Sequence, residues 1–149
     1  MATVLACVDL SSATEAVVRA AARVAVGFDS SLHLLHVAAG EPVLAGYDKD
    51  EIATFKRGDR AQQLLDEHHE LRDLAATIEA DGVTVVPLLE MGPTAETIVA
   101  VADHLDADVI AVGSHGHGRL HHLVVGSVSS AVLKSATRPV LVVPVRDAD

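Results

Sequence analysis

Five short apolar runs, separated by four segments of helical character, constrain the fold of this chain more than any other feature. Such runs, rich in Val, Leu, Ile and Ala, are typical of strands buried on both faces of a parallel sheet. The helical segments supply the crossovers that parallel pairing requires. The predicted strands are Thr3–Val8, Ser31–Val37, Val83–Leu89, Asp108–Gly113 and Pro139–Val143, and the predicted helices run from Ser11 or Ser12 to about Val26, from about Ile52 to Ala80, from Thr94 to about Leu105 and from near Gly126 to before Pro139.

This order of elements predicts a single α/β domain over residues 1–149, with a doubly wound, five-stranded parallel sheet and helices on both faces. The expected strand order is 3-2-1-4-5. The direction in which successive strands are added reverses after the third strand, so the switch point lies between the first and fourth strands. Ligands of such sheets bind outside the carboxyl ends of the strands at that switch point. Asp9 follows the first strand and Gly113 ends the fourth, which places both residues there.

The stretch GSHGHGRLHHLVVGSVSS, Gly113 to Ser130, follows the fourth strand and is rich in glycine. Glycine lets the backbone approach an anion closely, and Gly126-Ser127 opens a helix whose first amides are unpaired. These amides attract phosphate locally, although the protein as a whole carries a formal net charge of −10. A bound divalent cation could neutralise the remaining charge. The stretch therefore predicts a phosphate site.

Two common phosphate motifs do not fit this stretch. A Walker loop needs Lys and then Ser or Thr after its last glycine, but Gly118 is followed by Arg119 and Leu120. A dinucleotide fingerprint needs its glycines after the first strand, where this chain has Asp9.

The spacing that remains, Gly113-x2-Gly116-x9-Gly126-Ser127, resembles that of the universal stress protein family, in particular its ATP-binding branch. The resemblance runs nearly end to end and includes Asp9-Leu10-Ser11, LHLLHV, Gly92-Pro93-Thr94, ADVIAVGSHGHG and the closing GSVSSAVLKSATRPVLVVP. Many members have glycine where this chain has Leu10, and others have a bulky residue there.

The resemblance implies that the protein binds ATP, together with Mg or Mn. Carried over by position, it implies that Gly113, Gly116, Gly126 and Ser127 contact the triphosphate and ribose. Asp9 would face the ribose or adenine, and Val37 would offer backbone hydrogen bonds to the adenine. His36 is expected beside Val37, at the edge of the site.

Several of these residues also have simpler structural interpretations, which the sequence leaves open. The glycines can be turn residues, and Asp9 and Ser127 can be helix caps. His115, His117, His121 and His122 could suggest zinc, copper or nickel, but no Cys, Asp or Glu lies among them. We therefore predict a solvated loop and no metal site.

Charge and composition limit the possible partners. A net charge of −10 argues against nucleic acid and against an anionic membrane surface, since both need a basic footprint. No apolar run approaches the roughly 20 residues that span a bilayer. The start, MATVLACVDL, lacks a basic leader region, and Cys7 is the single cysteine. These features predict a cytoplasmic protein.

Asp9 is the one carboxylate that the sequence places at the site, and it lies on the nucleoside side. Hydrolysis needs a positioned base and usually a charge clamp, so we predict binding rather than catalysis and no catalytic residue. The expected function is an ATP-binding stress-response or signalling module that acts through an unknown protein partner. A slow ATPase or phosphotransfer enzyme and a dimeric scaffold that binds no nucleotide remain as alternatives.

The last strand, Pro139–Val143, is expected at a sheet edge. It is apolar and uncharged, and such an edge invites pairing with the same strand of a second chain. We therefore predict a homodimer through this strand, and the family resemblance points the same way. The alternative is an edge covered by the chain's own end, Val145–Asp149.

Overall fold

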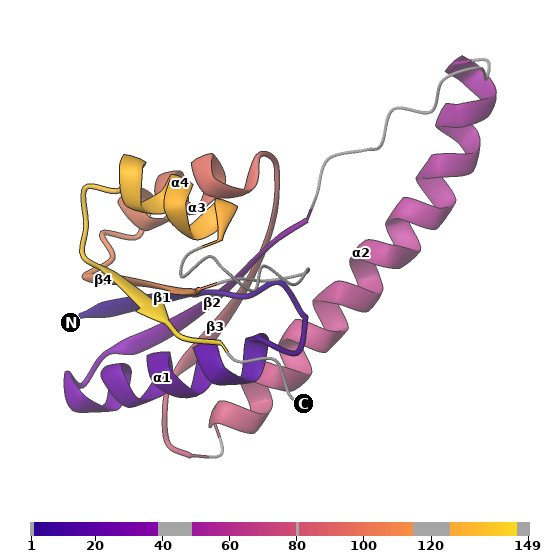
Figure 1. The fold of residues 1–149 in the computed structure, drawn as a ribbon. Coiled ribbons are helices and arrows are strands. Elements are labelled where there is room, and N and C mark those ends of the chain that lie inside the picture. The colour runs from indigo at the N-terminus through magenta and orange to yellow at the C-terminus, as the bar shows by residue number, and fades with distance from the viewer. Residues whose placement is uncertain (1, 39–48, 80, 115–125, 146–149) are drawn as a thin grey trace.

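The computed structural model of the protein describes residues 2–38, 49–79, 81–114 and 126–145. These residues form one sheet with helices on both faces (Figure 1). In chain order the elements are β1 (Thr3–Cys7), α1 (Thr14–Gly27), β2 (Ser31–Ala38), α2 (Lys49–Glu79), β3 (Val85–Met91), α3 (Thr94–His104), β4 (Val109–Gly113), α4 (Ser127–Ser135) and β5 (Val140–Val143).

The sheet is parallel throughout, and its strand order is β3-β2-β1-β4-β5, which confirms the predicted topology. β1 is central and pairs with β2 on one side, where Cys7 faces Leu35, and with β4 on the other, where Ala6 faces Ala111. β3 and β5 form the two edges. The switch point therefore lies between β1 and β4, as expected.

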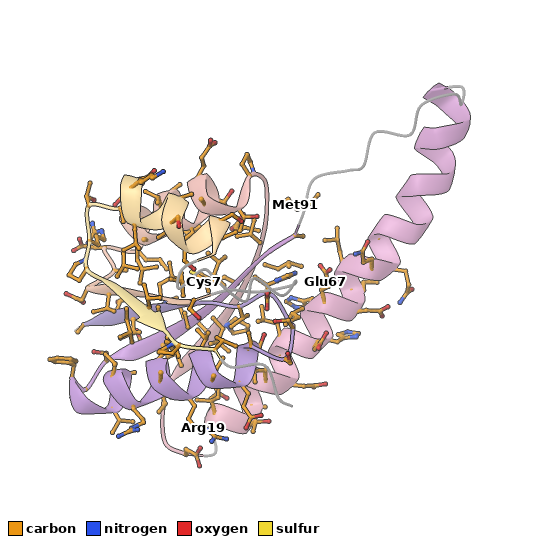
Figure 2. All side chains as sticks on the ribbon, viewed as in Figure 1. Cys7, Arg19, Glu67 and Met91 are labelled. Carbon is orange, nitrogen blue, oxygen red and sulfur yellow. The ribbon has the colours of Figure 1, made fainter. Side chains whose placement is uncertain are left out.

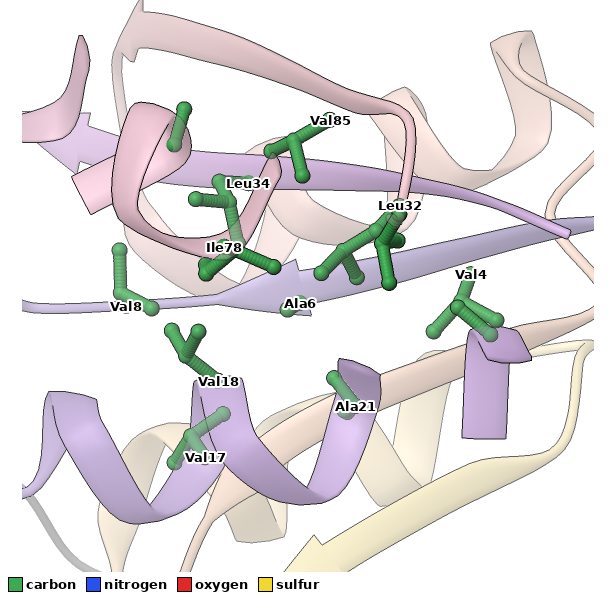
Figure 3. Close-up of a cluster of buried hydrophobic side chains, with 14 of the residues drawn as sticks. Val4, Ala6, Val8, Val17, Val18, Ala21, Leu32, Leu34, Ile78 and Val85 are labelled. Carbon is green, nitrogen blue, oxygen red and sulfur yellow. The ribbon is translucent and has the colours of Figure 1, made fainter. Parts of the chain in front are cut away.

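The core consists of two aliphatic clusters, one on each face of the sheet. Alternate strand residues such as Ala6 and Leu34 pack with α1 and α2 (Figure 3), and their neighbours Leu5 and Leu35 pack with α3 and α4. The helices contribute Val17, Val18, Ala21, Ala25, Leu71, Ala75 and Ile78 to the first cluster, and Ile98, Ala102 and Val132 to the second. This two-sided burial explains why the strand sequences are almost continuously apolar.

The start of α1 differs from the prediction, because the helix begins at neither Ser11 nor Ser12. The helix begins at Thr14, and its N-cap residue Ala13 makes no side-chain hydrogen bond. Asp9 and Ser11 instead bond to the backbone of the turn before the helix, as short polar side chains often do. At the other end, Asp29 rather than Gly27 adopts a left-handed backbone, with φ 52°.

The remaining boundaries differ by a few residues. α2 begins before Ile52 and ends at Glu79, whose carbonyl accepts the N–H of Gly82 (2.9 Å; φ 89°). Among its described side chains, Leu71, Ala75 and Ile78 form a buried stripe, while Leu65 is 51% exposed. Thr94 is the first residue of α3 and not its cap, a position taken by Pro93.

Among the described residues, no helix combines the length and the apolar character that crossing a membrane requires.

Candidate functional site

The carboxyl ends of β1, β2 and β4 bring most of the predicted site residues to one edge of the sheet. Extending the register by two residues from Cys7–Leu35 sets Asp9 level with Val37. Extending it by three from Ala6–Ala111 sets Asp9 level with Ser114, directly after Gly113. Neighbouring strands lie about 4.8 Å apart, so these backbones are adjacent at the switch point.

Asp9 has a structural role and leaves one carboxylate oxygen available. Its Oδ1 accepts hydrogen bonds from the backbone N–H of Ser11 (3.0 Å) and from the Ser11 hydroxyl. The Ser11 Oγ in turn accepts the N–H of Ala13 (3.2 Å). Asp9 Oδ2 has no hydrogen-bond partner within the described ranges. The carboxylate can therefore order the turn and still meet a ligand.

Leu10 adopts a left-handed backbone with φ 60°, a region that glycine occupies without strain. Its side chain packs against the cluster between the sheet and α1 and α2. The chain thus makes, at Leu10, the turn for which many members of the resembled family use glycine, with a side chain that also packs on the core.

The backbone N–H and C=O of Val37 point into the region past the carboxyl end of β1. Because Val8 N–H donates to Leu35 O (2.9 Å), Leu35 faces β1 in the ladder, and strand alternation gives Val37 the same direction. The next rung would join Val37 N–H to Val8 O, and no such bond forms. Among the described residues, the N–H and C=O of Val37 therefore have no partner on the β1 side and can meet one ligand edge that has both an acceptor and a donor.

The N-terminus of α4 is fastened to the end of β4. The buried hydroxyl of Ser129 donates to Gly113 O, and Gly126 N–H donates to Ser114 O. The N-cap residue is Gly126, so no side chain caps the helix, and the first intrahelical donor is Ser130 N–H (2.9 Å to Gly126 O). The amides of residues 127–129 thus lack partners in the described structure and form an anion-binding helix end.

Ser129 and Ser114 support this arrangement but were missed by sequence reasoning. The Ser114 hydroxyl accepts Val145 N–H (3.0 Å), and its N–H donates to Val143 O (2.8 Å). The serine-rich end of the loop was the available signal, but only three-dimensional contacts assign these two residues.

His36 lies at the edge of the site, as expected, and is buried on the α1 and α2 side. Its Nδ1 is 2.9 Å from Val8 O, directly before Asp9. Its Nε2 is 3.4 Å from Glu67 Oε2 on α2. Figure 2 places Glu67 on the part of α2 that approaches the sheet.

Gly116 and the four loop histidines, His115, His117, His121 and His122, lie outside the described residues. Within the described ranges, no three His, Cys, Asp or Glu side chains come together in a way that could hold a metal ion.

Known proteins share both the sequence pattern and this fold. The model of the Universal stress protein family matches residues 1–144. Universal stress protein A homolog 1 of Coxiella burnetii is 31% identical over 141 residues, which are 94% of each chain. Universal stress protein MJ0577 of Methanocaldococcus jannaschii is 33% identical over 75 residues, 50% of this chain and 46% of that protein.

Solved structures agree over nearly the whole chain. Universal stress protein UspA from Lactobacillus plantarum superimposes with a TM-score of 0.81 at 22% identity, covering 95% of this chain and 97% of that one. The universal stress protein from Archaeoglobus fulgidus in complex with dAMP gives a TM-score of 0.63 at 23% identity, covering 96% and 97%. The chain therefore belongs to the universal stress protein family.

Proposed function

We propose that this protein binds ATP at the carboxyl ends of β1, β2 and β4, and that occupancy of the site controls its contacts with a protein partner in a stress response. One observation carries the proposal: in the part of the chain that the structure describes, the amides that open α4 and the backbone N–H and C=O of Val37 have no partner, and both groups lie beside the same switch point. The first suits phosphate and the second suits a base edge. The dAMP complex of the Archaeoglobus fulgidus relative supports an adenine nucleotide.

The proposed placement is the one that the family resemblance implies, and the positions of the described groups support it. Gly113, Gly116, Gly126 and Ser127 contact the triphosphate and ribose, Asp9 Oδ2 faces the ribose or the base, and Val37 binds the adenine edge. Gly126 is buried, and its backbone is extended (φ −75°, ψ 177°), so it presents main chain and no side chain to the ligand.

A Mg or Mn ion would be bound mainly through the nucleotide. α4 has no acidic residue in its first turn, and one oxygen of Asp9 is already engaged. Phosphate oxygens and water would therefore supply most ligands, as is common for Mg²⁺. When bound, the ion would reduce the repulsion between the triphosphate and a protein of net charge −10.

The available groups favour binding over hydrolysis. Asp9 is the carboxylate that the described residues place at the site, and its Oδ1 bonds within its own turn. A water-orienting base beside the terminal phosphate would have to come from elsewhere. We further propose a cytoplasmic location, which suits a chain whose single cysteine, Cys7, is free.

Calorimetry with ATP on the wild type and on Gly126→Val tests the proposal. Valine tolerates the backbone at this position but blocks close approach of phosphate, so we expect affinity to fall at least about tenfold. Gly27→Val is the matched control, because a Cβ added there meets nothing within 4 Å. Equal ATP affinity in wild type and Gly126→Val would refute the site. More than one equivalent of ADP per chain, lost in Gly126→Val, would favour the ATPase alternative.

A further inference from the structure

We infer that His36 is a positioning residue for the base side of the proposed nucleotide site, and that Glu67 on α2 holds its ring in place. The inference rests on the proposed function and deepens it. It explains, by one side-chain hydrogen bond, why the pairing of β1 and β2 stops beside Val37.

The hydrogen bond of His36 shows which ring nitrogen must carry hydrogen. A carbonyl oxygen only accepts hydrogen bonds, so at 2.9 Å from Val8 O the Nδ1 atom must carry the hydrogen. The ring is buried, with the residue 8% exposed, so water competes little for this bond. Nε2 then faces α2.

This bond replaces a rung of the sheet. The β1–β2 ladder would continue with Val37 N–H donating to Val8 O, but that carbonyl accepts from His36 instead. The chain turns immediately afterwards at Leu10, with φ 60°. The ladder therefore ends at Val8 N–H to Leu35 O, and no described residue takes up the backbone N–H and C=O of Val37, which can bind a ligand.

Glu67 supports the ring from the other side. It stands one helical turn before Leu71 and continues the stripe of α2 that faces the sheet, where an apolar residue would be expected. Its Oε2 is buried, has no hydrogen-bond partner among the described residues, and lies 3.4 Å from His36 Nε2. A ring with hydrogen on Nδ1 alone would present a lone pair to this carboxylate, so Glu67 supports the ring in the form that carries hydrogen on both nitrogens and a positive charge. Gln63 Nε2 donates to Oε1 (3.4 Å). Because this carboxylate belongs to α2, a shift of that helix would move the His36 ring and so alter the base side of the site.

Two substitutions separate the two ring nitrogens. His36→Asn retains a donor where Nδ1 stands and can still bond to Val8 O, whereas His36→Gln retains one where Nε2 stands and releases that carbonyl. We expect His36→Gln to bind ATP about tenfold more weakly, the effect of one hydrogen bond, and His36→Asn to stay within about threefold of wild type. Inorganic tripolyphosphate, which lacks the base, should bind all three proteins equally.

Amide exchange measured by NMR without nucleotide gives a second readout. In His36→Gln, Val37 N–H can complete the ladder, and its exchange should slow at least about tenfold relative to wild type and His36→Asn.

The role of Glu67 has its own test. Glu67→Ala should weaken ATP binding about threefold, while Glu70→Ala, exposed on the same helix, should not.

Equal losses of ATP affinity in His36→Gln and His36→Asn, or unchanged Val37 exchange in His36→Gln, would overturn the inference. If His36→Gln does not fold, the wild-type imidazole decides: long-range ¹⁵N–¹H spectra must show hydrogen on Nδ1, and a bare Nδ1 contradicts the positioning role. A wild type that binds no ATP refutes the proposed function alone, because the exchange and imidazole measurements need no nucleotide.

Discussion

At the scale of single residues, Leu10 combines backbone strain with useful packing. Its φ of 60° disfavours any residue with a Cβ, and its side chain contacts the core. We predict that Leu10→Gly is more stable than Leu10→Ala by about 1 kcal/mol, because both lose the packing and only alanine keeps the strain. Urea denaturation measures both values.

The control for this pair is Ala16, which is exposed on α1. There the order should reverse, with Ala16→Gly less stable than wild type by about 1 kcal/mol, because glycine is unfavourable inside a helix. Finding Leu10→Ala at least as stable as Leu10→Gly would contradict the strain.

We expect His33 to lower the free energy of unfolding in acid. Desolvation lowers the pKa of His33, and its Nδ1 is buried without a hydrogen-bond partner among the described residues. Below about pH 6.5, where an unfolded histidine titrates, the unfolded chain binds the proton more readily than the folded one. Stability therefore falls as the pH drops from above 6.5 toward the lowered folded pKa, and this contribution is constant above that range.

We predict that His33→Leu loses less stability than wild type between pH 7.5 and pH 5.5. The difference should stay below about 1 kcal/mol, because part of the ring remains near water, which screens its charge. His69→Leu, at an exposed position of α2, should keep the wild-type pH dependence. Parallel pH dependence in His33→Leu and wild type, measured by urea denaturation, would contradict the assignment.

At the scale of elements, the sequence predicted every strand and helix found in the described residues, because apolar runs and helical spacing survive small shifts in boundary. The boundaries themselves depended on local contacts. Asp9 and Ser11 form their own turn, so α1 begins later than a serine cap would imply. Asp29 rather than Gly27 takes the left-handed backbone after α1.

Without the family resemblance, the residues of the candidate site were predictable only where topology decides them. Asp9 and Gly113 follow strands on either side of the switch point, so strand order alone brings them together. The open backbone of Val37 depends on which ladder direction that residue faces, and on a bond between His36 and Val8, 28 residues apart. No spacing rule in the sequence carries that information.

The docking of α4 onto β4 yields an element-scale prediction. Ser129 is 3% exposed, and its hydroxyl donates to Gly113 O, which holds the helix end beside the strand end. Ser129→Ala should lower the free energy of unfolding by about 1 to 2 kcal/mol and weaken ATP binding, because the amides of residues 127–129 lose their fixed position.

Ser135→Ala is the control for this prediction, since it changes the same residue type at the exposed far end of α4. It should leave both ATP affinity and stability within about 0.5 kcal/mol of wild type. Thermal unfolding and calorimetry measure the two effects, and equal behaviour of the two variants would show that the Ser129 bond does not position the helix.

At the scale of the whole molecule, the two sheet edges are not equivalent. Leu32 N–H donates to Thr84 O, so alternation directs Pro87 of β3 away from β2, toward solvent. A proline there has no N–H to offer a second chain, which blunts that edge. On β5, Ile110 N–H donates to Pro139 O, so Val140 and Val142 direct their backbones outward, with no proline between them.

This difference predicts a homodimer through β5, in which the strands of two chains pair antiparallel about a two-fold axis. Val140–Val143 is apolar, and its first three residues are only partly buried within one chain, so pairing would also cover side chains. Repulsion between two chains of net charge −10 is largely screened beyond about 8 Å at physiological salt. The alternative, an edge covered by the chain's own end at residues 145–149, predicts a monomer.

Sedimentation velocity distinguishes the two. We expect wild type at tens of micromolar to sediment as a particle of twice the monomer mass, and Val142→Pro to sediment as a monomer, because the substitution removes an outward N–H and leaves the bonds to β4 intact. Leu89→Pro makes the same change on the outward side of β3 and should remain dimeric. A wild type that stays monomeric with and without ATP would exclude the dimer, and loss of the dimer in Leu89→Pro alone would move the interface to β3.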